Sequence, residues 1–319
     1  MARTRAGDTV ELRSAREILA TLDEDGCAGG LPFMPEMLEF FGKRLDVRAR
    51  AERTCDTLTY TGTRHFPDTV ILDDLRCDGS GHDGCDARCR FFWRESWLRP
   101  AGASNASAEN DEDGDALAEL RRRAAAGSKR STDGPEPVYR CQATELLRAS
   151  ELEPWWSPRA LVREVTSGNV SPRRFVSVMT RAVVDQASKR MRRKPFGDDE
   201  PQARPGTPAG TPVEIGQLVQ VRSRAEVAAT LNEKFELRGL KFDVQEMGPY
   251  CGQRGRVIGR VRRFIDETTG KMIQLKTDAF MIDGFCCTGD YSTKRWFCQR
   301  GIYAWWREAW LTQADESDG

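Results

Sequence analysis

The sequence predicts an α+β fold that is mainly β with short helices and contains two related small open β-barrel modules. Three observations predict it: a long sequence repeat, short runs of alternating apolar and polar residues, and polar stretches rich in Gly and Pro between the repeats. The expected segments are module 1 with a metal site, a disordered linker, a helical basic insert, a second disordered linker and module 2. Their ranges are 7–98, 99–136, 137–194, 195–213 and 214–311.

The composition limits the class of protein. The chain has 319 residues with 49 basic and 49 acidic side chains, so its formal net charge is zero. Hydrophobic residues make up 39%, which is low for a globular protein and indicates that part of the chain is linker. We find neither an apolar run of about 18 residues, the length that crosses a membrane, nor a signal peptide at the start. We therefore expect a cytoplasmic protein with no membrane partner, whose ten cysteines are thiols or metal ligands.

The repeat defines the two modules. The sequence GDTVELRSAREILATLDE at 7–24 corresponds to GQLVQVRSRAEVAATLNE at 216–233. Near the module ends, WRESWL at 93–98 corresponds to WREAWL at 306–311. Two matched blocks in the same order indicate a duplication, and two copies are too few for a solenoid.

Each copy is expected to begin with a strand and a short helix. Residues 10–12 and 219–221 alternate like short strands. Ser14 and Ser223 are each followed three residues later by a Glu, the capping-box pattern in which the Ser accepts from a backbone amide and the Glu reaches back. Helices are therefore predicted to start after both serines.

Further strands follow in each copy. A second alternating run is expected over 44–51 and over 254–262. In copy 2, residues 266–271 form a predicted hairpin turn, followed by a return strand. A further strand is predicted at 70–72 in copy 1 and at 280–282 in copy 2.

These patterns resemble a known class of small barrel. The glycine-rich start of each copy and the GxxGRVxGRV strand at 252–261 resemble Src-homology-3-like barrels, including those found in nucleic-acid-binding modules. The resemblance covers about half of each copy. It implies a small open barrel in each module.

The stretch between the modules has mixed character. Residues 101–136 and 195–213 are rich in Gly, Pro, Ser and charged residues and lack apolar periodicity, so we expect disordered linkers there. Between them, Ser157-Pro158 and Ser171-Pro172 each place an N-cap residue before a proline suited to the first helical position. A helical insert with little core of its own is therefore predicted.

A cysteine–histidine cluster in module 1 is the sharpest chemical signal. Cys77, His82, Cys85 and Cys89 fall within thirteen residues, and three thiolates with one imidazole suit tetrahedral zinc, with iron as the alternative metal. Glycines between these residues allow a tight loop. We expect Cys85 and Cys89 to share one face of a helix that continues to Trp93 and Trp97. The alternative interpretation is a set of ordinary buried thiols.

Module 2 is expected to lack this site. Counting back from Trp310, Cys298 corresponds to Cys85 and Ile302 takes the place of Cys89, and no histidine lies between Cys287 and Cys298. Four thiols of the C-terminal half remain as a possible second cluster. These are Cys251, Cys286, Cys287 and Cys298. Elsewhere, Cys55 and Cys141 are interpreted as core thiols and His65 as a surface or loop residue.

Two basic segments predict contact with a polyanion. The net charge of zero hides them, and the alternative interpretation is a solvated face. The residues of the two segments are Lys189, Arg190, Arg192 and Arg193 in the insert and Arg254, Arg256, Arg260 and Arg262 in module 2.

Two functions are consistent with these patterns. The first is a zinc-stabilised tandem-barrel binding protein that contacts nucleic acid or a protein partner. The second is a metal- or thiol-dependent tailoring enzyme, a hydrolase or oxidoreductase, that acts on a small molecule or peptide. The sequence identifies no catalytic residue for the second function, since no general base stands near a candidate nucleophile.

Overall fold

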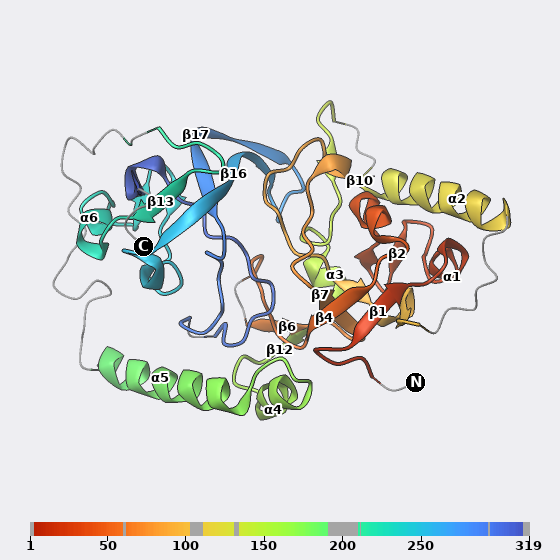
Figure 1. The fold of residues 1–319 in the computed structure, drawn as a ribbon, viewed down its shortest axis with the longest axis horizontal. Coiled ribbons are helices and arrows are strands. Elements are labelled where there is room, and N and C mark those ends of the chain that lie inside the picture. The colour runs from red at the N-terminus through yellow and green to blue at the C-terminus, as the bar shows by residue number, and fades with distance from the viewer. Residues whose placement is uncertain are drawn as a thin grey trace. The chain divides into compact units, whose positions relative to one another are not determined.

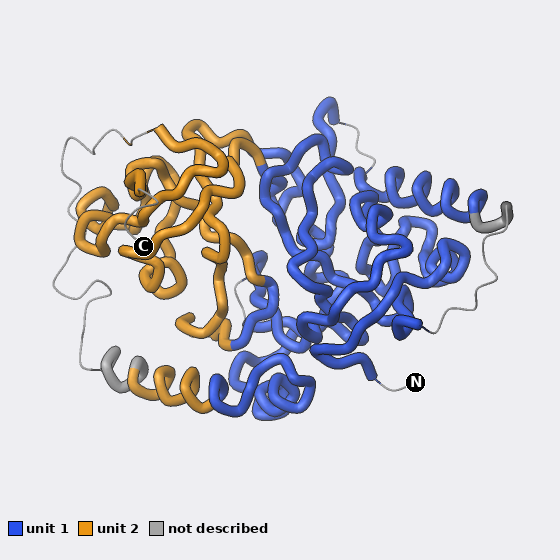
Figure 2. Tube along the Cα trace, viewed as in Figure 1, with its two compact units in different colours: residues 1–175, 264–273, 297–300 blue, residues 176–263, 274–296, 301–319 orange. Residues whose placement is uncertain are grey.

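The computed structural model describes residues 3–59, 62–102, 111–130, 134–190, 210, 212–292 and 294–314 (Figure 1). The chain forms two compact units (Figure 2). Unit 1 contains residues 1–175, 264–273 and 297–300, and unit 2 contains residues 176–263, 274–296 and 301–319. Small sheets and short helices make up both units, which confirms the prediction of a mainly β fold of the α+β class.

The main sheet of unit 1 has the strand order β8-β7-β4-β1-β9, and all neighbouring strands run antiparallel. Val10 is opposite Leu45 on one side and Pro100 on the other. Alternate residues of β4 are buried, as the sequence pattern predicts. The strands are β1 (Thr9–Leu12), β4 (Leu45–Arg50), β7 (Thr69–Leu72), β8 (Trp93–Arg94) and β9 (Leu98–Pro100).

Smaller elements surround this sheet. The strands are β2 (Cys27–Ala28) with β3 (Leu31–Pro32), β5 (Thr54–Cys55) with β6 (Thr63–His65) and β12 (Glu151–Glu153), and β10 (Lys129–Arg130) with β11 (Val138–Tyr139). The α-helices are α1 (Ala15–Leu19), α2 (Asp111–Gly127), α3 (Leu146–Ala149) and α4 (Pro158–Thr166). The 3-10 helices are η1 (Pro35–Phe40), η2 (Ser80–His82) and η3 (Glu95–Trp97).

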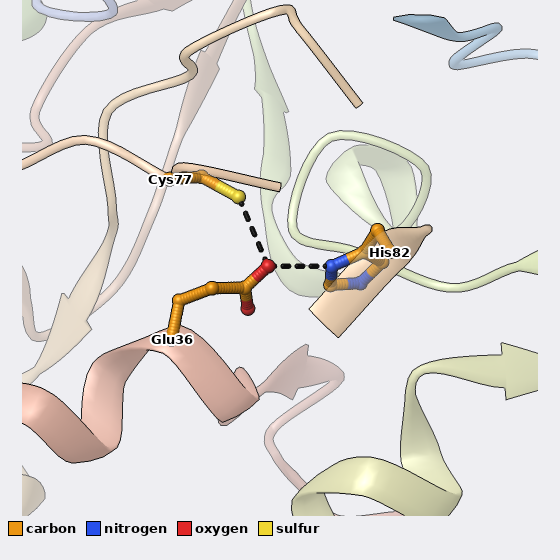
Figure 3. A group of neighbouring side chains, drawn as sticks. All are labelled: Glu36, Cys77 and His82. Carbon is orange, nitrogen blue, oxygen red and sulfur yellow. Dashed lines mark hydrogen bonds and ion pairs between the residues drawn. The ribbon is translucent and has the colours of Figure 1, made fainter. Parts of the chain in front are cut away.

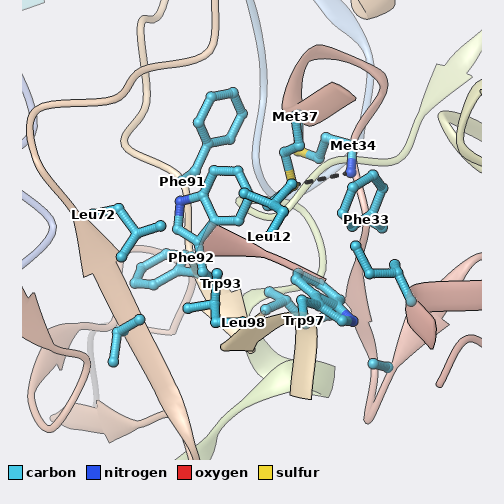
Figure 4. Close-up of a cluster of buried hydrophobic side chains, with 14 of the residues drawn as sticks. Leu12, Phe33, Met34, Met37, Leu72, Phe91, Phe92, Trp93, Trp97 and Leu98 are labelled. Atoms are coloured by element: carbon cyan, nitrogen blue, oxygen red, sulfur yellow. Dashed lines mark hydrogen bonds between the residues drawn. The ribbon is translucent and has the colours of Figure 1, made fainter. Parts of the chain in front are cut away.

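Aromatic side chains fill the core of unit 1 (Figure 4). The rings of Phe33 and Trp97 meet edge to face with centroids 5.2 Å apart. The indole N–H of Trp97 donates to Thr21 Oγ1 at 3.0 Å, which satisfies the only polar atom of this buried side chain.

Unit 2 has a related sheet. Its strand order is β17-β16-β13-β18, and β13 pairs antiparallel with both β16 and β18. The strands are β13 (Leu218–Val221), β14 (Glu236–Leu237), β15 (Leu240–Lys241), β16 (Arg254–Ile265), β17 (Met272–Ile282) and β18 (Leu311–Gln313). The end of β16 and the start of β17 lie in the part of the chain assigned to unit 1. The helices are α5 (Pro172–Arg190), which begins in unit 1, α6 (Arg224–Ala228), η4 (Gly248–Tyr250) and η5 (Glu308–Trp310).

The repeated residues make the same contacts in both units. Trp310 donates to Thr230 Oγ1 at 2.8 Å, as Trp97 does to Thr21. Arg94 and Arg307 are buried, and each donates to several backbone carbonyl oxygens. A buried guanidinium needs such acceptors because it cannot lose its charge. These contacts explain why the two sequence blocks match.

The first predicted linker needs a correction. We expected disorder over 99–136, but α2 occupies much of this stretch. Leu120 and Ala124 are buried in the core of unit 1, and Leu117 packs partly against it. These residues recur at helical spacing, a pattern that the abundance of charged residues obscured. The expected linker at 195–213 lies mostly outside the described residues and stays a prediction.

The insert at 137–194 also differs from the expectation. Its first part belongs to unit 1, because β12 pairs with β6 and places Leu152 opposite Arg64. Helix α4 begins at Pro158 and helix α5 begins at Pro172, as predicted. Within the described residues, no helix is long and apolar enough to cross a membrane.

A buried carboxylic acid ties α4 to distant segments of unit 1. Glu164 is fully buried, and its Oε2 accepts from Asn169 Nδ2 at 2.9 Å and from Gln299 Nε2 at 3.1 Å. Glu164 Oε1 has no hydrogen-bond partner among the described residues. Burial raises the pKa of Glu164 to about 8, although both amides and the nearby Arg53 act to lower it.

This raised pKa predicts a stability that depends on pH. Between pH 4.5 and 8 the folded protein holds a proton on Glu164 that the unfolded chain has released, so stability falls as the pH rises. Glutamine does not titrate, so we expect Glu164→Gln to lack the fall in stability that Glu164 causes. The melting temperature of this variant should fall less between pH 5 and pH 8 than that of wild type. Thermal unfolding at both pH values measures the difference, with exposed Glu24→Gln as control. Equal pH dependence in wild type and Glu164→Gln would contradict it.

Candidate metal centre

The loop that carries the predicted metal ligands is held in a tight conformation. Gly79 has a φ of +77°, and a Cβ there would lie 2.2 Å from the carbonyl oxygen of Cys85. Only glycine fits this position, because both the backbone angle and the contact exclude a side chain. The loop then forms η2, which ends at His82 and buries its ring.

A carboxylate from a different segment meets this loop. Glu36 lies on η1, whose first residue is Pro35, and its side chain is buried. Oε1 of Glu36 lies 2.8 Å from His82 Nδ1, 3.3 Å from Cys77 Sγ and 3.1 Å from the amide nitrogen of Gly81 (Figure 3). The structure therefore places Glu36 between the thiol and the imidazole.

The second nitrogen of His82 fixes how the ring is oriented. Nε2 lies 3.0 Å from the backbone oxygen of Arg140, which can only accept a hydrogen bond, so Nε2 carries a proton. Nδ1 is left facing Glu36 and Cys77. Histidine ligands of metals commonly donate their other ring N–H to a backbone carbonyl in this way.

Burial and charge act in opposite directions on this group. Burial would raise the pKa of Glu36, but its hydrogen bond with His82 and the charge of that ring hold the pKa below its usual range. Burial, followed by the adjacent Glu36 carboxylate, raises the pKa of the Cys77 thiol. Cys77 is therefore protonated and donates to Glu36, and a metal cation would have to replace that proton.

The three side chains fit a metal ion. One donor atom from each of Glu36, Cys77 and His82 lies within 4.8 Å of the other two. Carboxylate oxygen, thiolate sulfur and imidazole nitrogen are all ligands of zinc, with bond lengths of about 2.0–2.3 Å. Oε2 of Glu36 is buried without a hydrogen-bond partner among the described residues. A buried unpartnered carboxylate oxygen is costly, and a cation would remove that cost.

The other two predicted ligands are placed differently. Among the described residues, Cys85 and Cys89 do not belong to the group whose donor atoms lie within 4.8 Å of one another. The Sγ of Cys85 accepts from the amide of Ile265 at 3.5 Å, and the backbone oxygen of Cys89 accepts from the amide of Cys77 at 2.9 Å. A ligand role for Cys85 and Cys89 stays a prediction.

The expected helix from Cys85 to Trp97 is wrong. Residues 85–89 form no helix, Trp93 lies in strand β8, and Trp97 lies in η3. The positive φ of Arg88 interrupts right-handed helical backbone within this stretch, and positive φ angles at Asp83 and Gly84 precede it.

Sequence reasoning missed Glu36. It lies 46 residues before His82, outside any local motif. Unit 2 offers a signal in retrospect: Glu246 stands at the corresponding place and accepts from the amides of Gly289 at 3.2 Å and Ser292 at 2.8 Å. Ser292 occupies the place of His82, counted from the matching backbone contact of Cys287 with Ile302. A glutamate at this position in both copies indicates a side chain that accepts hydrogen bonds from the loop and holds it in place.

The remaining cysteines form no such group in the part of the chain that the structure describes. In unit 1, the Cys55 amide donates to Cys298 Sγ at 3.1 Å, and burial raises the pKa of Cys141 to about 12. Cys298 is assigned to unit 1, whereas the other members of the predicted second cluster belong to unit 2. These are Cys251, Cys286 and Cys287.

His65 is half-buried in β6, with Nδ1 3.4 Å from Glu52 Oε2.

The predicted polyanion-binding residues are described in part. The side chains of Lys189 and Arg190, and all of Arg192 and Arg193, lie outside the described residues. The other four arginines lie on β16. These are Arg254, Arg256, Arg260 and Arg262.

The metal assignment predicts which substitutions remove zinc. We expect wild type dialysed against trace zinc to retain about one equivalent and Glu36→Gln or Cys77→Ser to lose most of it, because each removes one of three charged or soft donors. Elemental analysis gives the content directly. Glu246→Gln is the matched control, since it changes the corresponding glutamate of unit 2 and should retain zinc. Equal zinc in wild type and Cys77→Ser would contradict the assignment.

Relatedness to other proteins adds nothing to this geometry. No protein-family model, curated protein or solved structure matches the chain. The assignment of the metal centre therefore depends on the donor set and its burial.

Proposed function

We propose that this protein is a zinc-stabilised binding protein with two related barrel-like modules and that its partner is nucleic acid. The observation that carries the proposal is the burial of the donor group in unit 1. Glu36 is 6% exposed and His82 is 1% exposed. A metal held by buried side chains is shielded from substrates, which favours a structural role and assigns function to the surface.

The surroundings of the donor group support a structural metal. Glu36 comes from η1, Cys77 and His82 come from the glycine-rich loop, and His82 contacts the backbone of Arg140 beyond β11. An ion bound here would connect η1 with the loop, and the hydrogen bond of His82 would link both to the segment after β11. Such a cross-link stabilises the folded state by the free energy of metal binding.

The relation between the two units supports the tandem arrangement. Their sheets share the strand order around β1 and β13, and both contain the Trp–Thr and buried arginine contacts. In unit 2 the corresponding loop donates backbone hydrogen bonds to Glu246. We infer that one copy holds the metal and the other is stable without it.

The surface of unit 2 supports nucleic acid as the partner. Arg254, Arg256 and Arg262 are exposed on β16, and this strand contains no acidic residue. Arginine side chains along one strand suit contacts with successive phosphates. The alternative of a metal-dependent enzyme has less support, because two of the three donors, Glu36 and His82, are buried.

Removal of zinc tests the structural role. We expect a chelator such as 1,10-phenanthroline to lower the melting temperature of unit 1 and added zinc to restore it, because zinc binds only the folded state. At free zinc 100 times the dissociation constant, the stabilisation is about 2.7 kcal/mol. Differential scanning calorimetry with and without chelator measures it, and Cys77→Ser, which lacks a ligand, should not respond. Zinc removal without any loss of stability would contradict the structural role.

Binding to nucleic acid tests the partner. We expect a labelled DNA duplex of random sequence to bind the full chain, with an affinity that falls as salt rises from about 50 to about 200 mM. Fluorescence anisotropy measures both. The absence of binding to any nucleic acid at the lower salt concentration would reject this partner.

A further inference from the structure

The short segment 297–300 belongs to unit 1, and each of its residues contacts another part of that unit. The ring of Phe297 stacks on the ring of Phe175, with centroids 5.4 Å apart and an interplanar angle of 15°. The backbone amide of Gln299 donates to the backbone oxygen of Arg53 at 3.0 Å. These contacts place the segment beside β5, which begins directly after Arg53.

This placement brings two cysteines together. The backbone amide of Cys55 in β5 donates to Sγ of Cys298 at 3.1 Å, across 243 positions of the sequence. Since an N–Cα bond is about 1.5 Å long, this sulfur lies no more than about 4.6 Å from the Cα of Cys55. A disulfide joins residues whose Cα atoms are about 4.4–6.8 Å apart, so the sulfur of Cys298 lies within the span of such a bond. Both side chains are thiols in the structure.

Burial limits which oxidants can reach the two thiols. Cys55 is 4% exposed and Cys298 is 5% exposed. A large thiol or disulfide reagent has little access to such sulfurs, whereas a small oxidant such as hydrogen peroxide needs only a brief local opening of the structure. Once one sulfur is oxidised, the other is its enclosed neighbour and can react with it.

A buried guanidinium group interacts with each thiol. Burial alone would lower the pKa of Arg300, but Glu267 and, after it, Cys55 raise this pKa well above its usual value. Burial lowers the pKa of Arg53, whereas nearby carboxyl groups and Cys298 act to raise it. The same interactions stabilise a thiolate, which is the nucleophile in thiol oxidation, and they offset the unfavourable effect of burial on that charge.

We propose that Cys55 and Cys298 are a redox-active pair that closes to a disulfide when the protein meets a peroxide. One thiolate attacks an oxygen of hydrogen peroxide, the O–O bond breaks and hydroxide leaves, so that this sulfur becomes a sulfenic acid. The second thiolate attacks the same sulfur, the S–S bond forms, and the S–O bond breaks to release a second hydroxide. The two protons of the thiols convert both hydroxides to water, and two electrons pass from the sulfurs to the peroxide.

The disulfide attaches segment 297–300 covalently to β5. Because the two cysteines are 243 positions apart, the bond closes a long loop and strongly restricts the unfolded chain. Oxidation is therefore expected to stabilise unit 1. The pair is independent of the proposed zinc centre, since none of Glu36, Cys77 and His82 belongs to it.

Peptide mapping of the full wild-type chain tests the pair. The protein is treated with hydrogen peroxide, its remaining thiols are alkylated in denaturant, and the digest is prepared without reductant and examined by mass spectrometry. We expect a linked peptide that contains Cys55 and Cys298. This peptide should be absent from untreated protein and should disappear when a phosphine reductant is added before alkylation.

Serine variants show whether both cysteines are needed. Cys55→Ser and Cys298→Ser should each lose the linked peptide, whereas the matched control Cys141→Ser, which removes another thiol of unit 1, should keep it. Oxidised wild type should melt roughly 5–10 °C above the reduced protein, and this rise should be absent from Cys55→Ser. A circular dichroism spectrum like that of wild type confirms that each variant folds.

Wild-type protein alone can overturn the proposal. If Cys55 and Cys298 are both alkylated after peroxide treatment, or if either is linked to a different cysteine, the two thiols are not a redox pair. This outcome requires no substitution, so it is decisive even where a serine at one of these buried positions prevents folding.

Discussion

The carboxylate of Glu36 is the constraint on which the arrangement of unit 1 around its loop depends. One oxygen, Oε1, contacts a thiol, an imidazole and a backbone amide, and these groups come from a loop that follows Glu36 by more than 40 residues. Burying a carboxylate is unfavourable unless it has such partners. The loop therefore has one favourable position, and its glycines allow the backbone to adopt it.

Unit 2 shows that the anchor does not require a metal ligand set. Glu246 accepts from backbone amides of the corresponding loop, including those of Gly289 and Ser292. In unit 1 a histidine and a cysteine meet the carboxylate instead, and three donors of different kinds replace a purely hydrogen-bonded contact. The glutamate thus contacts a thiol and an imidazole in unit 1 and mainly backbone amides in unit 2.

The sequence predicts those parts of this protein that local pattern determines. The capping boxes at Ser14 and Ser223 form with both reciprocal hydrogen bonds, and the alternation of β4 and β16 is seen in their burial. These features depend on residues three or two apart. The nearness of Cys77 and His82 is likewise predictable, because the glycine-rich loop between them is short.

The missed features depend on distant contacts. Glu36 meets His82 only because η1 packs against the loop, and α2 forms because Leu120 and Ala124 find a core to cover. Strong local charge made that helix look like a linker. Left-handed backbone at Arg88 interrupts the expected helix, and an arginine does not signal this conformation in the sequence.

The effect of charged side chains also depends on distant contacts, because side chains pair across strands. The sequence presents four equivalent arginines on β16, yet Arg260 is compensated by Asp278 from the adjacent strand. A count of basic residues therefore overstates the positive field of this strand. Which arginines of a strand are compensated by a carboxylate is decided by the register of the sheet and by side-chain contacts across strands, and the order of residues along the chain does not give these.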